Sequence, residues 1–428
     1  MKKALFIALT CFSLSTSLQA QDSESQLNTG SVYSYLGLGL PVDYASSLAG
    51  SMGLQGVALQ DYRLNNLSNP ALWSQGIYTN VNGGFSLRAF DATDNLGSRR
   101  NSLLQVSQFQ LVLPVKRERI GVSLSLAPIT ESRFQTAQDV VIPADQNNSG
   151  SPLEYRVNTS GTGGLNRLEL GVGIRIARGL TFGYAPSFIF GVLENTTTYN
   201  FEDQNFSNIN FTKINSNYGF GNRFGLYFNR YSLFGENDQL AFGATFNLPV
   251  NLDSESKVES DIGSANIDLI TAGEFGDQDV KMPMEAALGF GYHFNQQWLV
   301  SSDVLYQNWS EYQGRNEEMF TDRFKVGFGT QYAAARRSSP GGFFSRFNYR
   351  AGASFDTGSL EIDETEIQTY MLTAGIGIPS RGTGSSIDIN FDFGFRGTEA
   401  SDLIAEKIYG IRLSFNLSEL MFLQRRID

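Results

Sequence analysis

Cysteine and histidine are almost absent from this sequence, and their absence excludes several kinds of active site. Among 428 residues there is one cysteine, Cys11, and one histidine, His293. Cys11 lies in a stretch that we expect to be removed, so the mature chain would have no disulfide, no thiolate metal site and no cysteine nucleophile. The sequence also lacks a metal-ligand cluster, a G-x-S-x-G motif and a phosphate-binding loop. We therefore expect no enzyme activity, no metal and no cofactor.

Long apolar runs are missing beyond the first twenty residues. No run of eighteen apolar residues occurs there, which excludes transmembrane helices, because a helix needs about twenty such residues to cross a bilayer. The first twenty residues have a basic start at Lys2 and Lys3, a short apolar run, and a small residue, Ala20, before a cleavage point. They predict a secretory signal peptide over residues 1–20. The alternative, a buried N-terminal helix, would need an amphipathic or capped continuation that the sequence lacks.

Positive charge is also in short supply. Asp and Glu outnumber Lys and Arg by 43 to 32, which gives a formal net charge of −11. An acidic exported protein is a poor binder of nucleic acid, so we expect no nucleic-acid partner.

What the sequence does have is a strict alternation of apolar with small or polar residues. In residues 168–176 the even-numbered positions are aliphatic, and the odd-numbered ones are Glu, Gly, Gly and Arg. A strand with lipid on one face and a polar interior on the other must have this pattern, because successive side chains point to opposite faces. A soluble β-sandwich has a similar pattern, but it would not give connections that are longer on one side.

The connections between the alternating runs differ in length. The tightest turns include residues 116–118 and 177–178, whereas residues 131–164, 195–217 and 251–282 are long and polar. Bacterial outer-membrane barrels have short periplasmic turns, longer outer loops and an even number of strands. We therefore predict an all-β fold, a transmembrane antiparallel β-barrel of about fourteen strands. The predicted strands are 77–89, 104–115, 119–130, 165–177, 179–194, 218–231, 238–250, 283–295, 297–311, 320–335, 343–357, 368–379, 385–397 and 407–418.

Aromatic residues gather near the predicted strand ends. The clearest are Phe294, Trp298, Tyr306, Trp309 and Tyr332. Membrane interfaces favour such residues, since an aromatic ring is apolar while its N–H or O–H group needs water. We expect these side chains to form part of an interfacial girdle.

A barrel of about fourteen strands has an interior too wide to be filled by its own side chains. Residues 31–74 are rich in Ala, Gly and Ser and do not alternate like a strand. We predict that residues 21–75 form an N-terminal hatch in the interior of a barrel formed by residues 76–428. The alternative is an ordinary periplasmic linker.

Two local features would suit such a hatch. Asn69 and Pro70 can fix a turn, because Pro sets φ and Asn bonds nearby backbone. Glycine pairs such as Gly171 and Gly173 occupy inward strand positions, where they would allow the hatch to pack closely against the wall.

Pro128 and Pro186 fall inside predicted strands. Proline removes a donor from the ladder and is otherwise confined to edges and bulges. Because a closed barrel has no edges, Pro128 would loosen one seam beside the third strand. A simple bulge at the outer rim would explain the same residue.

Charged residues at the inward-facing positions of the predicted strands would line the interior of the barrel. The carboxylates are Glu169, Asp303, Asp388 and Asp392, and the arginines that could pair with them are Arg175, Arg350, Arg396 and Arg412. We interpret them as ion-paired wall structure, with gating of the hatch as the alternative.

Three stretches form a family pattern in one order across nearly the whole chain. They are Asp61 followed by Asn69-Pro70-Ala71-Leu72, Met282 to Tyr292 followed by Trp298, Asp303 and Asn308-Trp309-Ser310, and Val326-Gly327 to Tyr332 followed by Tyr349-Arg350-Ala351-Gly352. Together they resemble the outer-membrane long-chain fatty acid and aromatic hydrocarbon transporters, the FadL-like family. The resemblance implies a barrel plugged by a hatch, with an Asn-Pro-Ala motif before the first strand. It also implies a kink in the third strand that opens the wall sideways to lipid, and Pro128 lies in that strand.

We therefore expect a passive channel for hydrophobic small molecules, long-chain fatty acids or hydrocarbons, in the outer membrane of a Gram-negative bacterium. Outer loops would capture the solute and the hatch would gate it, with Asn69, Pro70, Ala71 and Pro128 as the ligand or gating residues. A lateral exit is sensible, since a lipophilic solute gains nothing by crossing an aqueous pore.

The expected partners are the solute, outer-membrane lipid and the barrel-assembly machinery. Gly410, Leu413 and Phe415 have the spacing of a closing strand that this machinery recognises. The alternative function is a protein-secretion or assembly scaffold that holds a cargo protein. Apolar residues pointing into the interior would favour the channel, and a wide polar interior would favour the scaffold.

Overall fold

The computed structural model describes most of the chain from residue 28 onwards. The described residues are 28–61, 66–95, 97–143, 152–201, 207–262, 265–268, 278–295, 297–334, 342–380, 384–400 and 403–419. Residues 1–20 lie outside these ranges, so the signal peptide stays a prediction.

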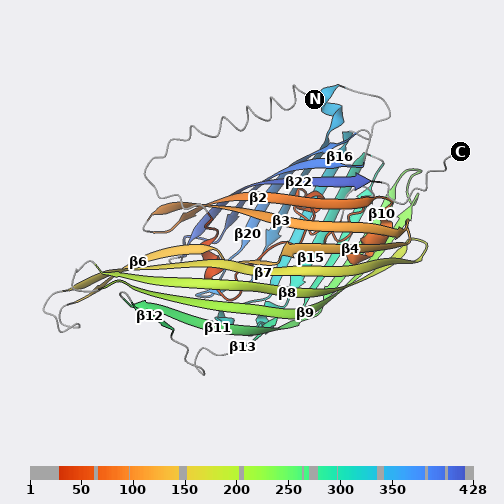
Figure 1. Ribbon diagram of the computed structural model, residues 1–428. Helices are drawn as coiled ribbons and strands as arrows, with labels where there is room; N and C mark the ends of the chain where they lie inside the picture. The colour runs from red at the N-terminus through yellow and green to blue at the C-terminus, as the bar shows by residue number, and fades with distance from the viewer. Residues whose placement is uncertain are drawn as a thin grey trace, which may run out of the picture.

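The described chain folds into a closed antiparallel barrel of fourteen wall strands (Figure 1). It closes where β2 pairs along its length with β22. The predicted fold class is therefore confirmed. The strands of the wall are β2 (Thr79–Thr93), β3 (Ser98–Lys116), β4 (Ile120–Pro128), β6 (Phe134–Ile142), β7 (Leu153–Ala177), β8 (Leu180–Phe201), β9 (Ile209–Tyr231), β10 (Gln239–Asn247), β11 (Val250–Ile262), β13 (Gln278–Met282), β14 (Glu285–His293), β15 (Trp298–Gln307), β16 (Arg323–Ala333), β17 (Asn348–Asp356), β20 (Thr369–Pro379), β21 (Ser386–Arg396) and β22 (Ala405–Glu419).

Three of the wall strands are interrupted. The third consists of β4 and β6, which both pair with β7. The seventh consists of β10 and β11, which both pair with β9. The eighth consists of β13 and β14, which pair with β11 and β10. A short strand, β12 (Ala265–Asp268), folds back on β11.

The alternation in the sequence matches the two faces of the wall. In β7, Leu168 and Leu170 are exposed on the outside, whereas Glu169 between them is 1% exposed. An apolar outer face and a polar inner face are what a membrane barrel requires.

The three stretches expected to be long polar loops are mostly strand. β6, β7, β8, β9 and β11 cover much of residues 131–164, 195–217 and 251–282. β7 alone has 25 residues, far more than the roughly ten needed to cross a bilayer. The expectation is wrong because the ladder continues beyond the apolar band, where both faces meet water and the alternation disappears. Figure 1 shows these strands projecting at one end, the loop end; the opposite, turn end carries residues 117–119 and 178–179.

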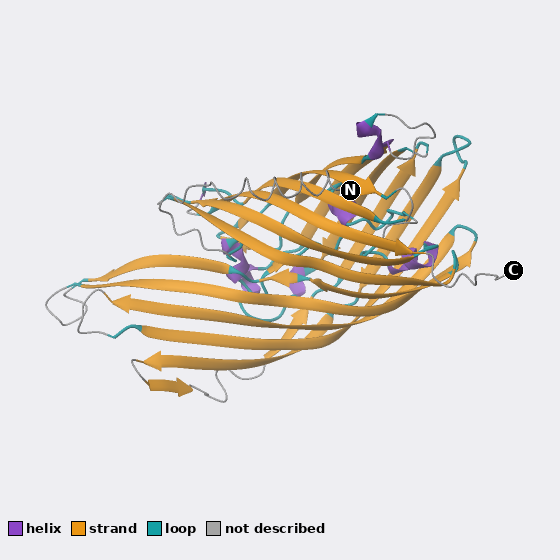
Figure 2. Ribbon diagram, turned by 45° about the horizontal axis from the view of Figure 1, so that its top comes forward, coloured by secondary structure: helices purple, strands orange, loops and turns teal. Residues whose placement is uncertain are grey.

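The N-terminal segment lies inside the barrel as a hatch (Figure 2). At the loop end, the Tyr33 hydroxyl donates to the Ile404 carbonyl at 2.5 Å. At the turn end, Glu118 N–H donates to the Gly76 carbonyl at 3.5 Å. The boundaries 21–75 and 76–428 stay predictions. The hatch elements are η2 (Val32–Tyr35), β1 (Leu40–Pro41), α2 (Ser47–Gly50) and η3 (Pro70–Gln75). Within the described residues, no helix has the length and apolarity to cross a membrane.

The aromatic residues near strand ends have two different surroundings. Phe294 and Trp298 are 56% and 44% exposed, as an interfacial position requires. Trp309 is only 2% exposed, so the prediction that it belongs to the interfacial girdle is wrong. The wall strand β15 ends before Trp309, and the chain turns inward through η4 (Trp309–Glu311), where the indole stacks on Phe320 with centroids 5.4 Å apart.

Candidate functional site

Asn69 and Pro70 form a turn that fastens the end of the hatch. Asn69 caps η3 by accepting a hydrogen bond from Ala71 N–H at 3.0 Å, and Pro70 opens the helix. The Asn69 amide also donates to the carbonyl of Val57 at 2.8 Å and to that of Leu226, in β9, at 3.0 Å. One side chain therefore joins the turn to the rest of the hatch and to the wall.

The wall opposite η3 has glycine at its points of contact. A Cβ on Gly171 would lie 2.6 Å from the Trp73 ring, and a Cβ on Gly173 would lie 2.6 Å from the Pro70 carbonyl oxygen. A Cβ on Gly121 would overlap the backbone of Trp73. The hatch therefore touches the wall backbone directly, as the inward glycines predict.

We call a group of wall glycines that lies against the hatch backbone a glycine seat. The glycines opposite η3 form one such seat, and a second holds the middle of the hatch. A Cβ on Gly352 would overlap the Met52 carbonyl, and a Cβ on Gly329 would lie 2.5 Å from the Met52 Cβ. A Cβ on Gly327 would overlap the Gly53 carbonyl. Wall strands β16 and β17 therefore leave no room for a side chain at these points.

Glu169 forms a buried ion pair with Arg223, and the pair is also fastened to the hatch. The side chains are 0% and 4% exposed. The Arg223 guanidinium donates to the carbonyls of Ser68 at 2.7 Å and Leu67 at 2.9 Å. Because its two terminal nitrogens donate to three acceptors, two in the hatch and one in the wall, the guanidinium fixes the hatch and the wall in one arrangement.

The arginines predicted to line the interior pair with carboxylates of the wall and its turns, and three of these pairs also bond to the hatch. Arg412 donates to the Gly50 carbonyl at 3.0 Å, Arg175 donates to the Gln75 side chain at 2.9 Å, and Glu406 accepts from Val32 N–H at 2.9 Å. The Asp303 carboxylate likewise accepts from hatch backbone, at 2.5 Å from Gly56 N–H. The pairs are Arg350–Asp388 at 2.6 Å, Arg412–Asp392 at 2.7 Å, Arg396–Glu406 at 3.5 Å and Arg175–Glu118 at 3.7 Å.

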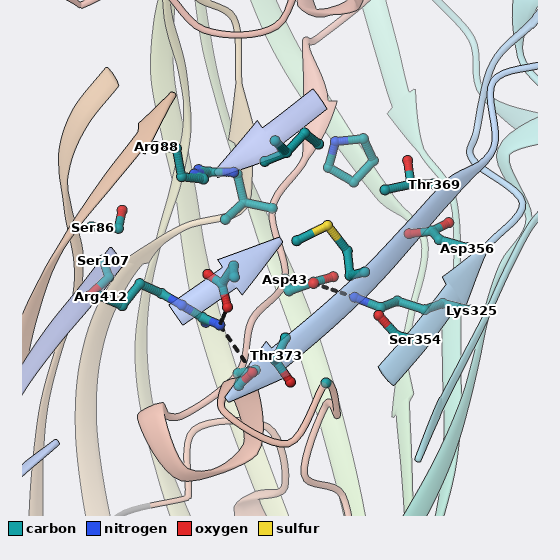
Figure 3. Close-up of a pocket in the computed structure, with 18 of the residues that line it drawn as sticks. Asp43, Ser86, Arg88, Ser107, Lys325, Ser354, Asp356, Thr369, Thr373 and Arg412 are labelled. Atoms are coloured by element: carbon teal, nitrogen blue, oxygen red, sulfur yellow. Dashed lines mark hydrogen bonds and ion pairs between the residues drawn. The ribbon is translucent and has the colours of Figure 1, made fainter. Parts of the chain in front are cut away.

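A charged cavity of about 160 Å³ lies between the hatch and the wall (Figure 3). Asp43 of the hatch forms an ion pair with Lys325 of β16, and its carboxylate lies 3.4 Å from Arg323. Arg323 in turn binds Asp356 at 2.5 Å. Burial raises the pKa of the Asp43 carboxyl, but Lys325 and Arg323 outweigh that effect and hold the pKa well below its usual range.

The lining of this cavity suits ions and polar groups. Each charged side chain that lines it forms an ion pair, which offsets its loss of water. An apolar solute would separate these pairs without replacing them. The charged lining residues are Asp43, Arg88, Arg323, Lys325, Asp356, Asp392, Arg396 and Arg412.

Pro128 lies where the third wall strand breaks. β4 ends at Pro128, and the ladder between β3 and β4 ends at the pair Phe109 and Leu126. Among the described residues, no ladder joins the remainder of β3 to β6. Ile129 N–H donates to Leu165 of β7 at 2.8 Å, so alternation directs the Pro128 nitrogen towards β3. Because the ladder has ended there, the missing donor costs no hydrogen bond.

The hatch is bonded through its backbone to this break. β1 pairs with β5 (Thr130–Glu131), which lies between β4 and β6. Gly30 N–H donates to the Arg133 carbonyl at 2.7 Å, and Asn28 N–H donates to the Ser102 carbonyl of β3 at 2.8 Å. The first described residues of the hatch therefore bridge the two sides of the break.

An apolar cluster fills the loop end of the interior. We call it the loop-end cluster. Its hatch members are Val32, Tyr33, Leu36, Leu38, Tyr44 and Leu67, and its other members include Ala127, Ile129, Leu165, Ile189, Leu193, Val250, Leu252, Trp309, Tyr312 and Phe320. Because Ala127 and Ile129 flank Pro128, the cluster extends to the break in the wall.

The structure does not bring the predicted site residues together. The Asn69 turn contacts β9 near the turn end, whereas Pro128 pairs with Asn166 beside the break. Sequence reasoning missed Asp43 and Arg223; an inward strand position could have indicated Arg223, but no motif indicates Asp43. In the described part of the chain, no group of His, Cys, Asp or Glu side chains could hold a metal.

A closed barrel whose own N-terminal segment fills its interior defines the class of plugged outer-membrane β-barrels. A family model named BamG matches residues 1–428, and the chain belongs to the BamG family. No curated protein matches the sequence.

Several solved structures share the fold. The Pseudomonas putida toluene transporter TodX is 15% identical with a TM-score of 0.55, over 89% of this chain and 99% of that one. The Ralstonia pickettii toluene transporter TbuX is 14% identical with a TM-score of 0.54, over 88% and 98%. A Pseudomonas aeruginosa FadL homologue is 11% identical with a TM-score of 0.56, over 89% and 99%. The predicted resemblance to the FadL-like family is confirmed at the level of fold.

Proposed function

We propose that the protein is a passive outer-membrane channel for hydrophobic small molecules, fatty acids or hydrocarbons, with a lateral exit at the break in the third strand. The observation that supports this best is the extent of the loop-end cluster. It begins among the loops and reaches Ile129, next to the end of the β3 ladder.

The charged network favours a sideways route over an axial one. A lipophilic solute that stayed on the axis would reach the ion pairs of Asp43 and Arg223. Separating the buried Arg223–Glu169 pair costs about 3–5 kcal/mol, and the Asp43–Lys325 pair, whose carboxylate is partly exposed, adds a smaller cost. A route through the break would follow the cluster as far as Ala127 and Ile129 and would avoid both of these pairs. The toluene transporters of the same fold add support for a hydrophobic solute.

A disulfide between the hatch and the break tests this exit. Pro41 and Thr130 face each other across the β1–β5 pair, so cysteines at both positions should form a bond. With Cys11 replaced as well, no other cysteine is present. We expect the oxidised Pro41→Cys, Thr130→Cys variant to lose most uptake of radiolabelled fatty acid or toluene, and the reduced protein to recover it.

Two controls make that result interpretable. Each single cysteine variant should transport like the parent with and without oxidant. Equal uptake by the oxidised and reduced double variants, at matched surface abundance, would reject movement of the hatch at this point. No uptake of either compound by the parent would reject the channel itself.

A second candidate, an assembly or secretion scaffold, is favoured by the charged centre of the interior. Eight charged side chains line the cavity, and a protein ligand would use such groups better than a hydrocarbon would. Native mass spectrometry of the protein extracted in mild detergent separates the two. Bound fatty acid or hydrocarbon supports the channel, whereas a stoichiometric complex with the barrel-assembly machinery or another protein supports the scaffold.

A further inference from the structure

A cationic groove crosses the break at the loop end. It has a volume of about 750 Å³ and lies between β2, β3 and β22 on one side and β6 and β7 on the other. Figure 1 shows β3 and β6 diverging towards this end. The lining residues are Asp91, Thr93, Ser98, Arg99, Arg100, Gln135, Ala137, Arg156, Asn158, Lys407 and Tyr409.

The groove has the opposite charge to the chain as a whole. Four cations and one carboxylate line it, whereas the whole sequence has a net charge of −11. Arg100 and Arg156 have carboxylate partners in Asp91 and Asp139. Arg99 bonds only to a neutral group, the Gln135 side chain at 3.1 Å. Such a patch on an acidic protein attracts anions.

The strand register places this charge directly above an apolar band. Asp91 lies opposite Lys407 on one side and Arg100 on the other. Four positions nearer the turn end, Leu87 lies opposite Ile411 and Leu104. The side chains of Leu87, Leu104 and Ile411 are 47%, 59% and 49% exposed. Since a strand rises about 3.4 Å per residue, the charged row and the aliphatic row are about 14 Å apart.

Tyr409 stands between the two rows. It pairs with Ala89, midway between the level of Asp91 and that of Leu87, and it is 42% exposed. The surface therefore presents aliphatic side chains, then a tyrosine, then cations. This order matches the layers of a lipid leaflet, which run from acyl chains through the interface to the headgroups.

We propose that this groove is a binding site for an anionic phospholipid-type headgroup. Its phosphate would contact Arg99, Arg100 and Lys407, and its acyl chains would lie on Leu87 and Leu104. A lipid held there would cover the break between β3 and β6 from outside. The proposal requires the barrel to lie in a membrane but does not depend on transport.

A lipid fits the groove better than an extended polypeptide or a free anion. The unpaired edges of β3 and β6 could accept a strand, but such a partner would use backbone groups and would not need cations above an aliphatic row. Free phosphate would use the cations alone and leave the aliphatic row exposed to water.

Lipid binding by the purified full chain tests the proposal. The probes are a dioleoyl phosphatidate, a dioleoyl phosphatidylcholine and inorganic phosphate, each measured by native mass spectrometry in a neutral detergent. We expect phosphatidate to bind and phosphatidylcholine with the same acyl chains not to bind. The Arg99→Gln, Lys407→Gln variant, which removes two cations that form none of the ion pairs of the described residues, should lose affinity by about thirtyfold.

A matched variant controls for total charge and folding. Arg230→Gln, Lys257→Gln removes the same two residue types from strands β9 and β11, away from the groove, and should bind phosphatidate like the parent. Equal binding of both lipids would overturn the proposal, as would full phosphatidate binding by the Arg99→Gln, Lys407→Gln variant. Displacement by inorganic phosphate at a similar concentration would reduce the groove to a plain anion site and would also overturn it.

Discussion

The two halves of the hatch are held in the barrel by different forces. Residues 28–42 contact the loop end through the loop-end cluster and through backbone bonds to the broken strand. Residues 43–61 and 66–75 contribute Tyr44 and Leu67 to the same cluster, but they are also held by ion pairs, glycine seats and the Asn69 turn. Apolar contacts are non-directional, whereas a buried ion pair or a backbone lying against glycine has one geometry.

This difference indicates which half is able to move. Sliding an apolar side chain over apolar neighbours exchanges one contact for another. Moving a guanidinium out of its set of acceptors leaves several buried groups unpaired. We therefore expect the turn-end half to act as an anchor and the loop-end half, with the break that it bridges, to be the part that responds to a solute.

The largest expected effect comes from removing the anchor at Arg223. The Arg223→Met variant would leave the Glu169 carboxylate buried and unpaired, at a cost of about 3–5 kcal/mol. Urea unfolding in lipid vesicles measures this loss. Arg156→Met removes the same residue type from a pair whose side chains are 58% and 69% exposed, and should have little effect on stability because water screens the pair. Similar losses in both variants would contradict the assignment of an anchor.

A smaller effect is expected from filling a glycine seat. In Gly352→Ala the new methyl group would overlap the Met52 carbonyl, and such overpacking costs about 1–3 kcal/mol. The hatch should become sensitive to protease while the barrel keeps its heat-modifiable migration. In the control, Gly291→Ala, the nearest atom to the new Cβ is 3.5 Å away, so protease sensitivity should not change. An equally resistant Gly352→Ala hatch would show that the seat is not tight.

Loss of the Asn69 turn should have a more local effect. Replacing Asn69 and Pro70 by alanine removes a cap worth about 1 kcal/mol and frees a fixed φ. We expect faster amide exchange in η3, altered ligand uptake and an intact barrel. Ser46→Ala removes the cap of α2, which lies elsewhere in the hatch, and should leave exchange in η3 unchanged. Uptake equal to the parent's, despite faster exchange, would remove Asn69 and Pro70 from the gating residues.

The sequence predicts those features of the wall and the hatch that depend only on residues close together in the chain. Alternation locates the wall strands because lipid on one face and polar groups on the other impose a period of two. The Asn69 turn follows from the chemistry of two adjacent residues. The inward glycines at 171 and 173 indicate a close approach even though their partner is not apparent from the sequence.

The sequence does not predict the parts that depend on long-range register. Asp43 binds Lys325 across 282 positions, and Arg223 binds Glu169 from another strand. Neither pair gives a recognisable pattern in a short stretch of sequence, because its partners are far apart in the chain. The strand extensions are missed for a different reason, because β7 loses its alternation beyond the membrane while keeping its ladder. The prediction for Trp309 is wrong because an aromatic residue at a strand end can point outward to lipid or inward to the loop-end cluster, and the sequence does not distinguish the two.

The smallest change tests the break itself. Pro128→Val would supply an N–H directed towards β3, next to the point where the ladder ends at Leu126. That donor could extend the ladder by one bond and straighten the third strand. If the break is the exit, fatty acid uptake should slow while surface abundance and heat-modifiable migration stay unchanged.

Pro186 offers a matched control, because it lies inside β8 and pairs with Asn222 far from the break. Pro186→Val should transport like the parent. Slower uptake in Pro128→Val alone would place the exit at the third strand, because only that substitution adds a donor beside an unpaired edge. Uptake by Pro128→Val equal to the parent's would count directly against Pro128 as part of the exit. Unchanged uptake in both this variant and the Asn69, Pro70 variant would favour the scaffold, since a barrel that carries no solute needs neither a gate nor a gap.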